Sequence, residues 1–296
     1  MERDQASDAQ FLYDERSVRY DKSWHPRFAK HMIELINLKP GETVLDLACG
    51  TGLVSLQAAK IVGPSGSVVG IDISSGMLAQ AEKKMSTEAA HDNVRFIRHS
   101  ITDLESVVEL KEKKFDVITC ASALVLFQRP AIALKQWTRY LKPRGRLIVD
   151  ATHPMSQISG IVFERVGNQL GNPIPSYRLP FQKPEDLEVI MKDAGLEDVS
   201  TRLVAQLDIQ GTEALSDYVW KENETRVENV YHVDDWEDVF EKGIRTNWLH
   251  HLAVDEASKE KAKKLFKEEW TNVADSEGKI YEVDGVFVGI GYRKPN

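Results

Sequence analysis

An acidic side chain and two glycines stand close together in the segment VLDLACGTG, residues 44–52. An apolar run leads into Asp46, and the glycines that follow, Gly50 and Gly52, have no side chains to keep a ligand away from the backbone. The helix expected after Gly52 would present free N–H groups at the same place. The segment therefore predicts a ligand-binding turn between a strand and a helix.

A second acidic residue, Asp72, ends the next apolar run, about twenty residues further along the chain. At that position a carboxylate can accept both hydroxyls of a ribose that carries no phosphate. A dinucleotide would need a third glycine where this chain has Ser55, and the carboxylate of Asp46 would repel a pyrophosphate. Asp46 suits a ligand with a positively charged amine instead. These residues predict a derivative of adenosine as the ligand.

The order of four segments resembles that of the class I S-adenosylmethionine-dependent methyltransferases, whose fold is Rossmann-like. The segments are VLDLACGTG, VVGIDIS, FDVITCASAL and LKPRGRLIV, and they lie within residues 40–150. The opening RYDKSWHPRF is similar to small-molecule methyltransferases near those of quinone biosynthesis and to fungal-type secondary-metabolite enzymes. The resemblance implies transfer of a methyl group from S-adenosylmethionine to a small-molecule acceptor. Oxygen is the expected acceptor atom, with carbon and nitrogen as alternatives.

The resemblance also assigns the cofactor contacts. Ile73 and Met77 would pack on one side of the adenine, Ser100 and Ile101 would close its other side, and Ala121 would lie near the transferred methyl group. Ser100 stands where the common pattern has an aspartate, although its hydroxyl can still bind the adenine amine. The predicted cofactor-binding residues are Tyr20, Asp46, Ala48, Cys49, Gly50, Thr51, Gly52, Asp72, Ile73, Met77, Ser100, Ile101 and Ala121.

A catalytic base is needed only for a weakly acidic acceptor hydroxyl, where it contributes about 10²–10⁴-fold. His153 is the predicted base, because it follows the fifth expected strand and ligands of open α/β sheets lie beyond the carboxyl ends of the strands. For His153, as for His25, a structural role is the alternative. Cys49 and Cys120 lie in apolar runs and are expected to be buried fillers, so neither a disulfide framework nor a metal site is predicted.

Strand-like and helix-like runs alternate between residues 26 and 151, which predicts a parallel sheet covered on both faces. We expect a three-layer α/β sandwich of the Rossmann-like type, with a mostly parallel seven-stranded sheet and an antiparallel last strand. The expected strands are residues 43–47, 67–73, 94–97, 115–120, 146–150 and 199–209, and the expected helices are residues 26–36, 53–62, 77–85, 102–110, 131–141, 158–170 and 184–194.

The final third of the chain contains a long helical pattern, residues 211–275, with four tryptophans at positions 220, 236, 248 and 270. We predict a helical lid that helps to select the substrate, with a permanently docked subdomain or a dimer interface as the alternatives. An Asp284-Gly285 turn between two apolar runs then predicts a hairpin. Because the last strand must rejoin the sheet, residues 1–296 are expected to form one domain, with a core of residues 26–210 and 280–293.

Composition limits the partners. The net charge of −8 disfavours nucleic acid, because phosphate binding uses clustered Lys and Arg. No apolar run reaches the ~18 residues that a membrane span needs, and the polar N-terminus lacks the apolar core of a signal peptide. We expect a small-molecule substrate, no nucleic acid, no membrane span, a cytoplasmic location, and a monomer or homodimer. Two other classes stay open: a binding module that keeps the cofactor fold without methyl transfer, and a nicotinamide oxidoreductase.

Overall fold

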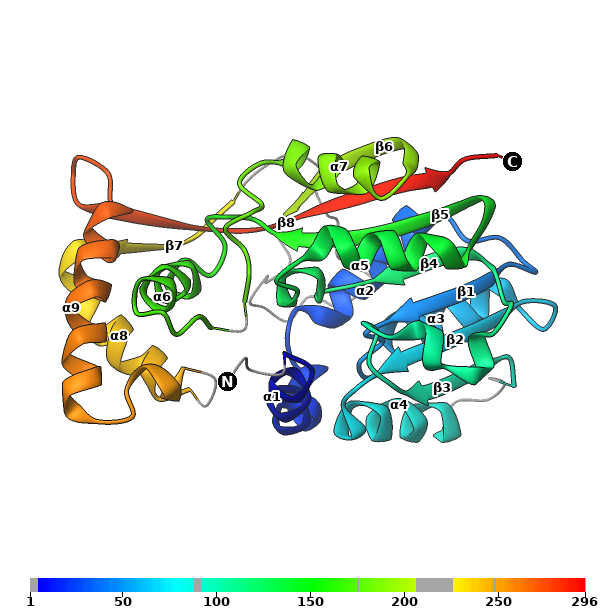
Figure 1. The fold of residues 1–296 in the computed structure, drawn as a ribbon, viewed down its shortest axis with the longest axis horizontal. Coiled ribbons are helices and arrows are strands. Elements are labelled where there is room, and N and C mark those ends of the chain that lie inside the picture. Colours follow the sequence, from blue (N-terminus) through cyan, green and yellow to red (C-terminus); the bar gives the residue numbers. More distant parts are fainter. Residues whose placement is uncertain (1–4, 88–91, 175, 206–225, 247–248, 296) are drawn as a thin grey trace.

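The computed structural model describes residues 5–87, 92–174, 176–205, 226–246 and 249–295 (Figure 1). Its sheet has the strand order β3-β2-β1-β4-β5-β8-β6, and β7 pairs with β8 beside this path. The first five strands are parallel, whereas β8 is antiparallel to β5, β6 and β7. The strands are β1 Thr43–Leu47, β2 Ser67–Asp72, β3 Val94–Arg98, β4 Phe115–Cys120, β5 Leu141–Thr152, β6 Leu196–Ala205, β7 Arg226–His232 and β8 Lys279–Arg293. The predicted mixed sheet is confirmed, with β7 as an additional strand.

Alternating side chains of the central strands build two cores. Leu45 and Leu147 belong to the core shared with α5 (Pro130–Trp137) and α7 (Pro184–Asp193), whereas Val44 and Ile148 belong to the core shared with α2 (His25–Ile36) and α3 (Leu53–Val62). Because both faces are covered, these strands read as continuous apolar runs in the sequence. Figure 1 shows α5 and α7 in front of the sheet, and α2 and α3 behind it. The three-layer prediction is therefore confirmed.

Two helices frame the lower end of the sheet in Figure 1. α4 (Ser75–Thr87) follows β2, and α1 (Gln5–Tyr20) lies against α4. The sequence patterns did not predict α1. They also predicted a helix over residues 102–110, where the chain forms two short 3₁₀ turns, Leu104–Ser106 and Val108–Leu110. Leu104 is buried in the first turn and Leu110 in the second. The predicted α-helix is therefore wrong, although a short helical turn buries each of these leucines.

The predicted hairpin at the C-terminus is wrong, because β8 runs without a turn through Asp284 and Gly285. Asp284 pairs with Arg226 of β7, and Gly285 pairs with Ala205 of β6. The two ladders on β8 therefore meet at the expected turn and hold it extended. Tertiary pairing here overrides the local turn tendency of an Asp-Gly pair.

The wholly helical prediction for residues 211–275 is also wrong, because β7 lies within this range. Its described part continues with α8 (Trp236–Ile244) and α9 (Glu256–Asn272), while residues 211–225, with Trp220, and residues 247–248, with Trp248, lie outside the described residues. α8 and α9 pack with α6 (Ile158–Gln169) around a third core that contains Phe163, Phe240, Phe266 and Trp270. Within the described ranges, no helix is both long and apolar enough to cross a bilayer.

Candidate active site

The turn after β1 brings the chain into left-handed backbone at three positions, Ala48 (φ 53°), Gly50 (φ 54°) and Gly52 (φ 77°). The two glycines serve different purposes. A Cβ on Gly52 would lie 3.0 Å from Phe96 and 3.2 Å from Ala81, so its absence lets β3 and α4 pack closely. A Cβ on Gly50 would meet only Tyr20, at 4.0 Å. Gly50 therefore leaves backbone open toward a cavity, as predicted for a ligand-binding turn.

The carboxylate of Asp72 joins the first turn to the second. Its Oδ2 accepts the Gly50 N–H (2.8 Å) and its Oδ1 accepts the Ser74 N–H (2.8 Å). Asp72 is only 8% exposed, and burial raises the pKa of the carboxyl although the backbone donors act to lower it. A carboxylate has about four lone-pair sites, so acceptor capacity remains for a ligand in the cavity that Asp72 lines.

Asp46 lies deeper, with 1% of its surface exposed. Its carboxylate accepts hydroxyl hydrogens from Ser55 (2.5 Å) and from Thr119 of β4 (2.6 Å). Burial raises the pKa of Asp46 to about 6, against the lowering effect of these two donors. Ser55, which breaks the dinucleotide pattern in the sequence, therefore has a function in this chain: it holds Asp46 in place.

Two cavities adjoin at this edge of the sheet. The larger has about 690 Å³ of empty space, including its open mouth, and the smaller about 360 Å³. Both are bordered by Tyr20, Ala48, Gly50, Ala121 and Ser122, which we call the junction. Of the predicted cofactor residues, those lining the larger cavity are Tyr20, Ala48, Gly50, Asp72, Ile73, Met77, Ser100, Ile101 and Ala121. Asp46, Cys49 and Thr51 line the smaller cavity, and Gly52 lines neither of the two.

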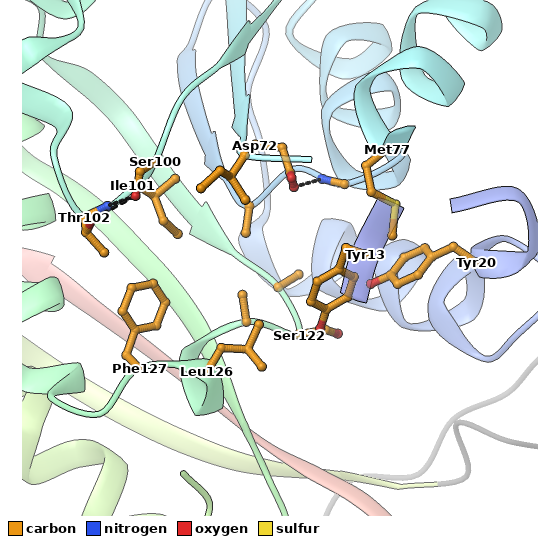
Figure 2. A pocket seen from close by; sticks show the side chains of 15 residues that line it. Tyr13, Tyr20, Asp72, Met77, Ser100, Ile101, Thr102, Ser122, Leu126 and Phe127 are labelled. Atoms are coloured by element: carbon orange, nitrogen blue, oxygen red, sulfur yellow. Dashed lines mark hydrogen bonds between the residues drawn. The ribbon is translucent and has the colours of Figure 1, made fainter. Parts of the chain in front are cut away.

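The two ends of the larger cavity differ in character (Figure 2). At one end Ser100 and Thr102 present hydroxyls, whose oxygens lie 2.7 Å apart, near the apolar side chain of Phe127. At the other end Tyr13 and Tyr20 gather around the junction. The first end combines hydroxyls with an apolar ring, and the second is lined by the rings of two tyrosines.

Helix α1 supplies the two tyrosines and is fixed over the site by two carboxylates. Asp14 accepts the Ser74 hydroxyl (2.6 Å) and the Gly76 N–H (2.8 Å), so it binds the start of α4. Asp21 accepts the Thr51 hydroxyl (2.6 Å) and pairs with Lys84 (2.7 Å). Sequence reasoning included Tyr20 but missed Tyr13 and both acids. The available signal was the spacing of seven residues between Tyr13 and Tyr20, which places both on one face of α1, whereas Asp21 lies just beyond the end of the helix.

The carboxyl ends of β4 and β5 contribute a further pair that the sequence analysis missed. The Ser122 N–H donates to Asp150 Oδ1 (2.6 Å), and Ser122 has left-handed backbone (φ 57°). Asp150 is 3% exposed, and burial raises the pKa of its carboxyl to about 7. The Ser122 hydroxyl oxygen is buried and has no hydrogen-bond partner within the described ranges.

The two histidines considered from the sequence occupy different places. His153 lines neither cavity; its Nδ1 accepts the Met155 N–H (3.1 Å), and its ring packs on Phe287 with 5.2 Å between ring centroids. Burial lowers the pKa of His153. His25 borders the smaller cavity and stacks on the rings of Tyr20 (3.9 Å) and Trp24 (4.1 Å), and burial lowers its pKa to about 3.

Both cysteines are buried and free, as expected for small fillers. Burial raises the pKa of the Cys49 and Cys120 thiols well above the usual value, so both stay protonated near neutral pH. Protonated thiols are poor nucleophiles, and neither cysteine is a candidate for covalent chemistry.

Comparisons with known proteins identify the family of this chain. A family model described as a methyltransferase domain matches residues 38–168. The chain is 32% identical to the ubiquinone/menaquinone biosynthesis C-methyltransferase UbiE of Ectopseudomonas mendocina over 191 residues, which cover 60% of this chain and 73% of that enzyme. It is also 32% identical to the enzyme of the same name from Azotobacter vinelandii, with 60% and 74% covered.

Solved structures agree on the fold. The cyclopropane-fatty-acyl-phospholipid synthase-like protein of Lactobacillus casei aligns with a TM-score of 0.58 and 19% identity, over 91% of this chain and 90% of that one. The YcgJ protein of Bacillus subtilis aligns with a TM-score of 0.53 and 15% identity, over 90% and 98%. From the matching sequence segments, the Rossmann-like sheet and the identity with the quinone-biosynthesis enzymes, the chain belongs to the class I S-adenosylmethionine-dependent methyltransferases.

Proposed function

We propose that S-adenosylmethionine lies across both cavities, with the adenosine in the larger cavity and the methionine part in the smaller one. The observation that carries the proposal is the junction, where two cavities of unequal character meet beside the open backbone of Gly50. The larger cavity has the volume of an ordinary small-molecule site. The carboxylates of Asp72 and Asp46 would face the ribose and the positively charged amine, respectively.

When bound, S-adenosylmethionine supplies an electrophilic methyl group on a positively charged sulfur. The chain's own residues then have two tasks, to orient the ligand and to exclude water. The Asp72 carboxylate accepts the N–H of Gly50 and so keeps this turn in place. Tyr13 and Tyr20 cover the junction from α1, and the hydrogen bonds of Asp14 and Asp21 hold that cover closed.

For the acceptor we propose a small oxygen-bearing ring of the quinone-precursor type, methylated on a ring carbon beside a hydroxyl. The two relatives are C-methyltransferases of ubiquinone and menaquinone biosynthesis, which supports carbon in place of the oxygen expected from the sequence alone. No Lys or Arg is among the described residues that line either cavity, which suits an uncharged ring next to the junction.

His153 stays the proposed base for the acceptor hydroxyl. Its low pKa leaves the imidazole neutral at pH 7 and able to take a proton. We expect His153→Ala to lower turnover at least about tenfold while the affinity for the cofactor is unchanged. The contact of His153 with Met155 makes the thermal stability of the variant a necessary control. Unchanged turnover in a folded variant would leave His153 with a structural role only.

The acceptor is tested with methyl-labelled S-adenosylmethionine and two probes, a naphthohydroquinone and a simple catechol. We expect one labelled methyl group on a ring carbon of the hydroquinone, located by NMR of the product. A label on oxygen would restore the oxygen assignment. Cofactor binding without labelled product from either probe would contradict the proposed acceptor class and favour a binding module.

A further inference from the structure

A buried carboxyl group lies directly behind the junction. Asp150 directly follows Val149, the last residue of β5 that pairs with β4, and its Oδ1 accepts the N–H of Ser122, which borders both cavities. Asp150 itself is 3% exposed and lines neither cavity. Figure 2 shows Ser122 below Tyr13 and across the cavity from Asp72.

The surroundings of Asp150 do not neutralise its charge. Tyr13 and Tyr20 of α1 and Cys120 of β4 interact electrostatically with Asp150, and their raised pKa values leave all three neutral. Arg202 of β6 pairs with Val288, one strand further from Asp150, and is exposed. On the other side, Val288 of β8 is paired with Asp150 and is apolar. No Lys, Arg or His donates to Asp150 in the part of the chain that the structure describes. A buried carboxylate without a cation is costly unless a ligand brings the charge.

Ser122 makes the link between this carboxyl and the junction. Its backbone lies in the left-handed region at φ 57°, a strained state for a serine that the N–H bond to Asp150 helps to hold. Its hydroxyl oxygen is buried and has no partner within the described residues. Buried polar groups usually find partners, so a ligand that passes between the cavities is the natural partner for this hydroxyl.

We propose that Ser122 and Asp150 distinguish the positively charged sulfonium of S-adenosylmethionine from the neutral thioether of its product, S-adenosylhomocysteine. The proposal rests on the placement of the cofactor across both cavities. The sulfur joins the two halves of the cofactor and therefore belongs at the junction. Asp72 and Asp46 face the ribose and the amine, which both molecules contain, so these two carboxylates do not distinguish the cofactor from its product. In a site poor in water, a nearby carboxylate attracts a cation strongly, and loss of the charge after methyl transfer would favour release of the product.

The pH dependence has a defined sign. Burial raises the pKa of Asp150 to about 7 in the free protein, so the carboxyl is ionised at pH 8 and protonated at pH 6. Only the ionised form attracts the sulfonium. We therefore expect the ratio of the S-adenosylhomocysteine Kd to the S-adenosylmethionine Kd to be higher at pH 8 than at pH 6. Because the ligands also ionise, the quantity to compare is this ratio in the wild type against the same ratio in Asp150→Asn.

The test is calorimetric titration of both ligands, without acceptor, into wild type, Asp150→Asn and Ser122→Ala at pH 6 and pH 8. Asp150→Asn keeps an acceptor for the Ser122 N–H and removes only the charge. Ser122→Ala removes the hydroxyl, and Ala48 shows that this chain accommodates alanine in left-handed backbone. Asp116→Asn is the matched control, since Asp116 lies at the opposite end of β4 and binds Thr43 and Lys142.

We expect Asp150→Asn to lower the ratio at pH 8 about tenfold, with the S-adenosylhomocysteine affinity retained. Ser122→Ala should lower the ratio in the same direction by a smaller factor, and Asp116→Asn should leave it unchanged. Retained affinity for the product shows that each variant is folded. An equal ratio in wild type and Asp150→Asn at both pH values would overturn the proposal. Failure of the wild type to bind either ligand would overturn the cofactor placement as well, whereas failure to methylate the ring probes would affect only the proposed acceptor.

Discussion

Two helical regions outside the sheet are held by opposite kinds of contact. Helix α1 is tied to the cofactor turns by carboxylates, Asp14 on Ser74 and Gly76 and Asp21 on Thr51. Its outer face is exposed, with Val18 66% accessible. The group of α6, α8 and α9 is instead closed by aromatic rings that are at most 1% exposed: Phe163, Phe240, Phe266 and Trp270. The ring centroids of Phe163 and Phe266 are 4.6 Å apart.

The difference indicates which region can open. A hydrogen bond to a charged group contributes about 1.5–3 kcal/mol at most, less where water competes, and it re-forms with water when broken. Truncating a buried aromatic side chain costs about 3–5 kcal/mol, because a cavity remains. The polar attachment therefore suits a cover that must admit a ligand, and the aromatic attachment suits a fixed support. We therefore predict that α1 is the part that moves, and the lid predicted for residues 211–275 stays an open prediction.

The largest effect is expected from Trp270→Ala. The side chain is fully buried, and its indole N–H donates to the His232 carbonyl (3.2 Å). We expect a loss of about 3–5 kcal/mol in the free energy of unfolding, measured by denaturant titration. The matched control is Trp236→Ala, because Trp236 is partly exposed and the Lys267 Nζ lies 4.9 Å from the centre of its ring. We expect this variant to lose about 1 kcal/mol or less in the free energy of unfolding. Equal losses in the two variants would mean that the aromatic group is not a closed core.

A smaller effect is expected from Asp14→Ala, which removes the attachment of α1 to α4. We expect the affinity for S-adenosylhomocysteine to fall about tenfold, equal to about 1.4 kcal/mol, mainly through faster dissociation. Stopped-flow fluorescence with Tyr20 and Trp24 beside the site measures the rate. Val18→Ala, on the exposed face of the same helix, should leave the association and dissociation rates of the ligand unchanged. An Asp14→Ala variant with wild-type dissociation would contradict the role of α1 as the cover.

The smallest expected change is in amide exchange of α6 and α9 when ligand is added. Because these helices share a buried aromatic core, their amides should be protected in the free protein and change little with S-adenosylhomocysteine. The amides of α1 should gain protection in the same experiment. Protection that rises strongly in α9 on ligand binding would instead support the predicted lid.

The sequence was most informative where chemistry and local structure coincide. The turn after β1 needs Gly50 for open backbone and Gly52 for close packing, and both needs appear as glycines beside an acid. Twelve of the thirteen predicted cofactor residues border at least one of the two cavities, and the exception, Gly52, packs close to Phe96. Buried parallel strands can also be predicted from the sequence, because both of their faces are apolar and they form continuous apolar runs.

The missed features depend on contacts between distant parts of the chain. Ser122 and Asp150 are 28 residues apart and meet only because β4 and β5 are parallel neighbours. The straight course of β8 through Gly285 depends on ladders to β6 and β7. The place of α1 depends on hydrogen bonds to Ser74 and Thr51, which lie in distant parts of the chain. Local patterns carry no information about such pairings.

Calorimetric titration of wild type and Asp72→Ala shows directly whether the cavity beside Gly50 and Asp72 binds S-adenosylmethionine. Loss of two charge-assisted hydrogen bonds to the ribose, at about 1.5 kcal/mol each, predicts an affinity about a hundredfold weaker. Since Asp72 also accepts the Gly50 and Ser74 N–H groups, thermal unfolding of the variant is recorded in parallel. We expect clear binding by the wild type and a large loss of affinity in a folded Asp72→Ala variant. No binding by the wild type, or unchanged affinity in the variant, would rule out this cofactor site.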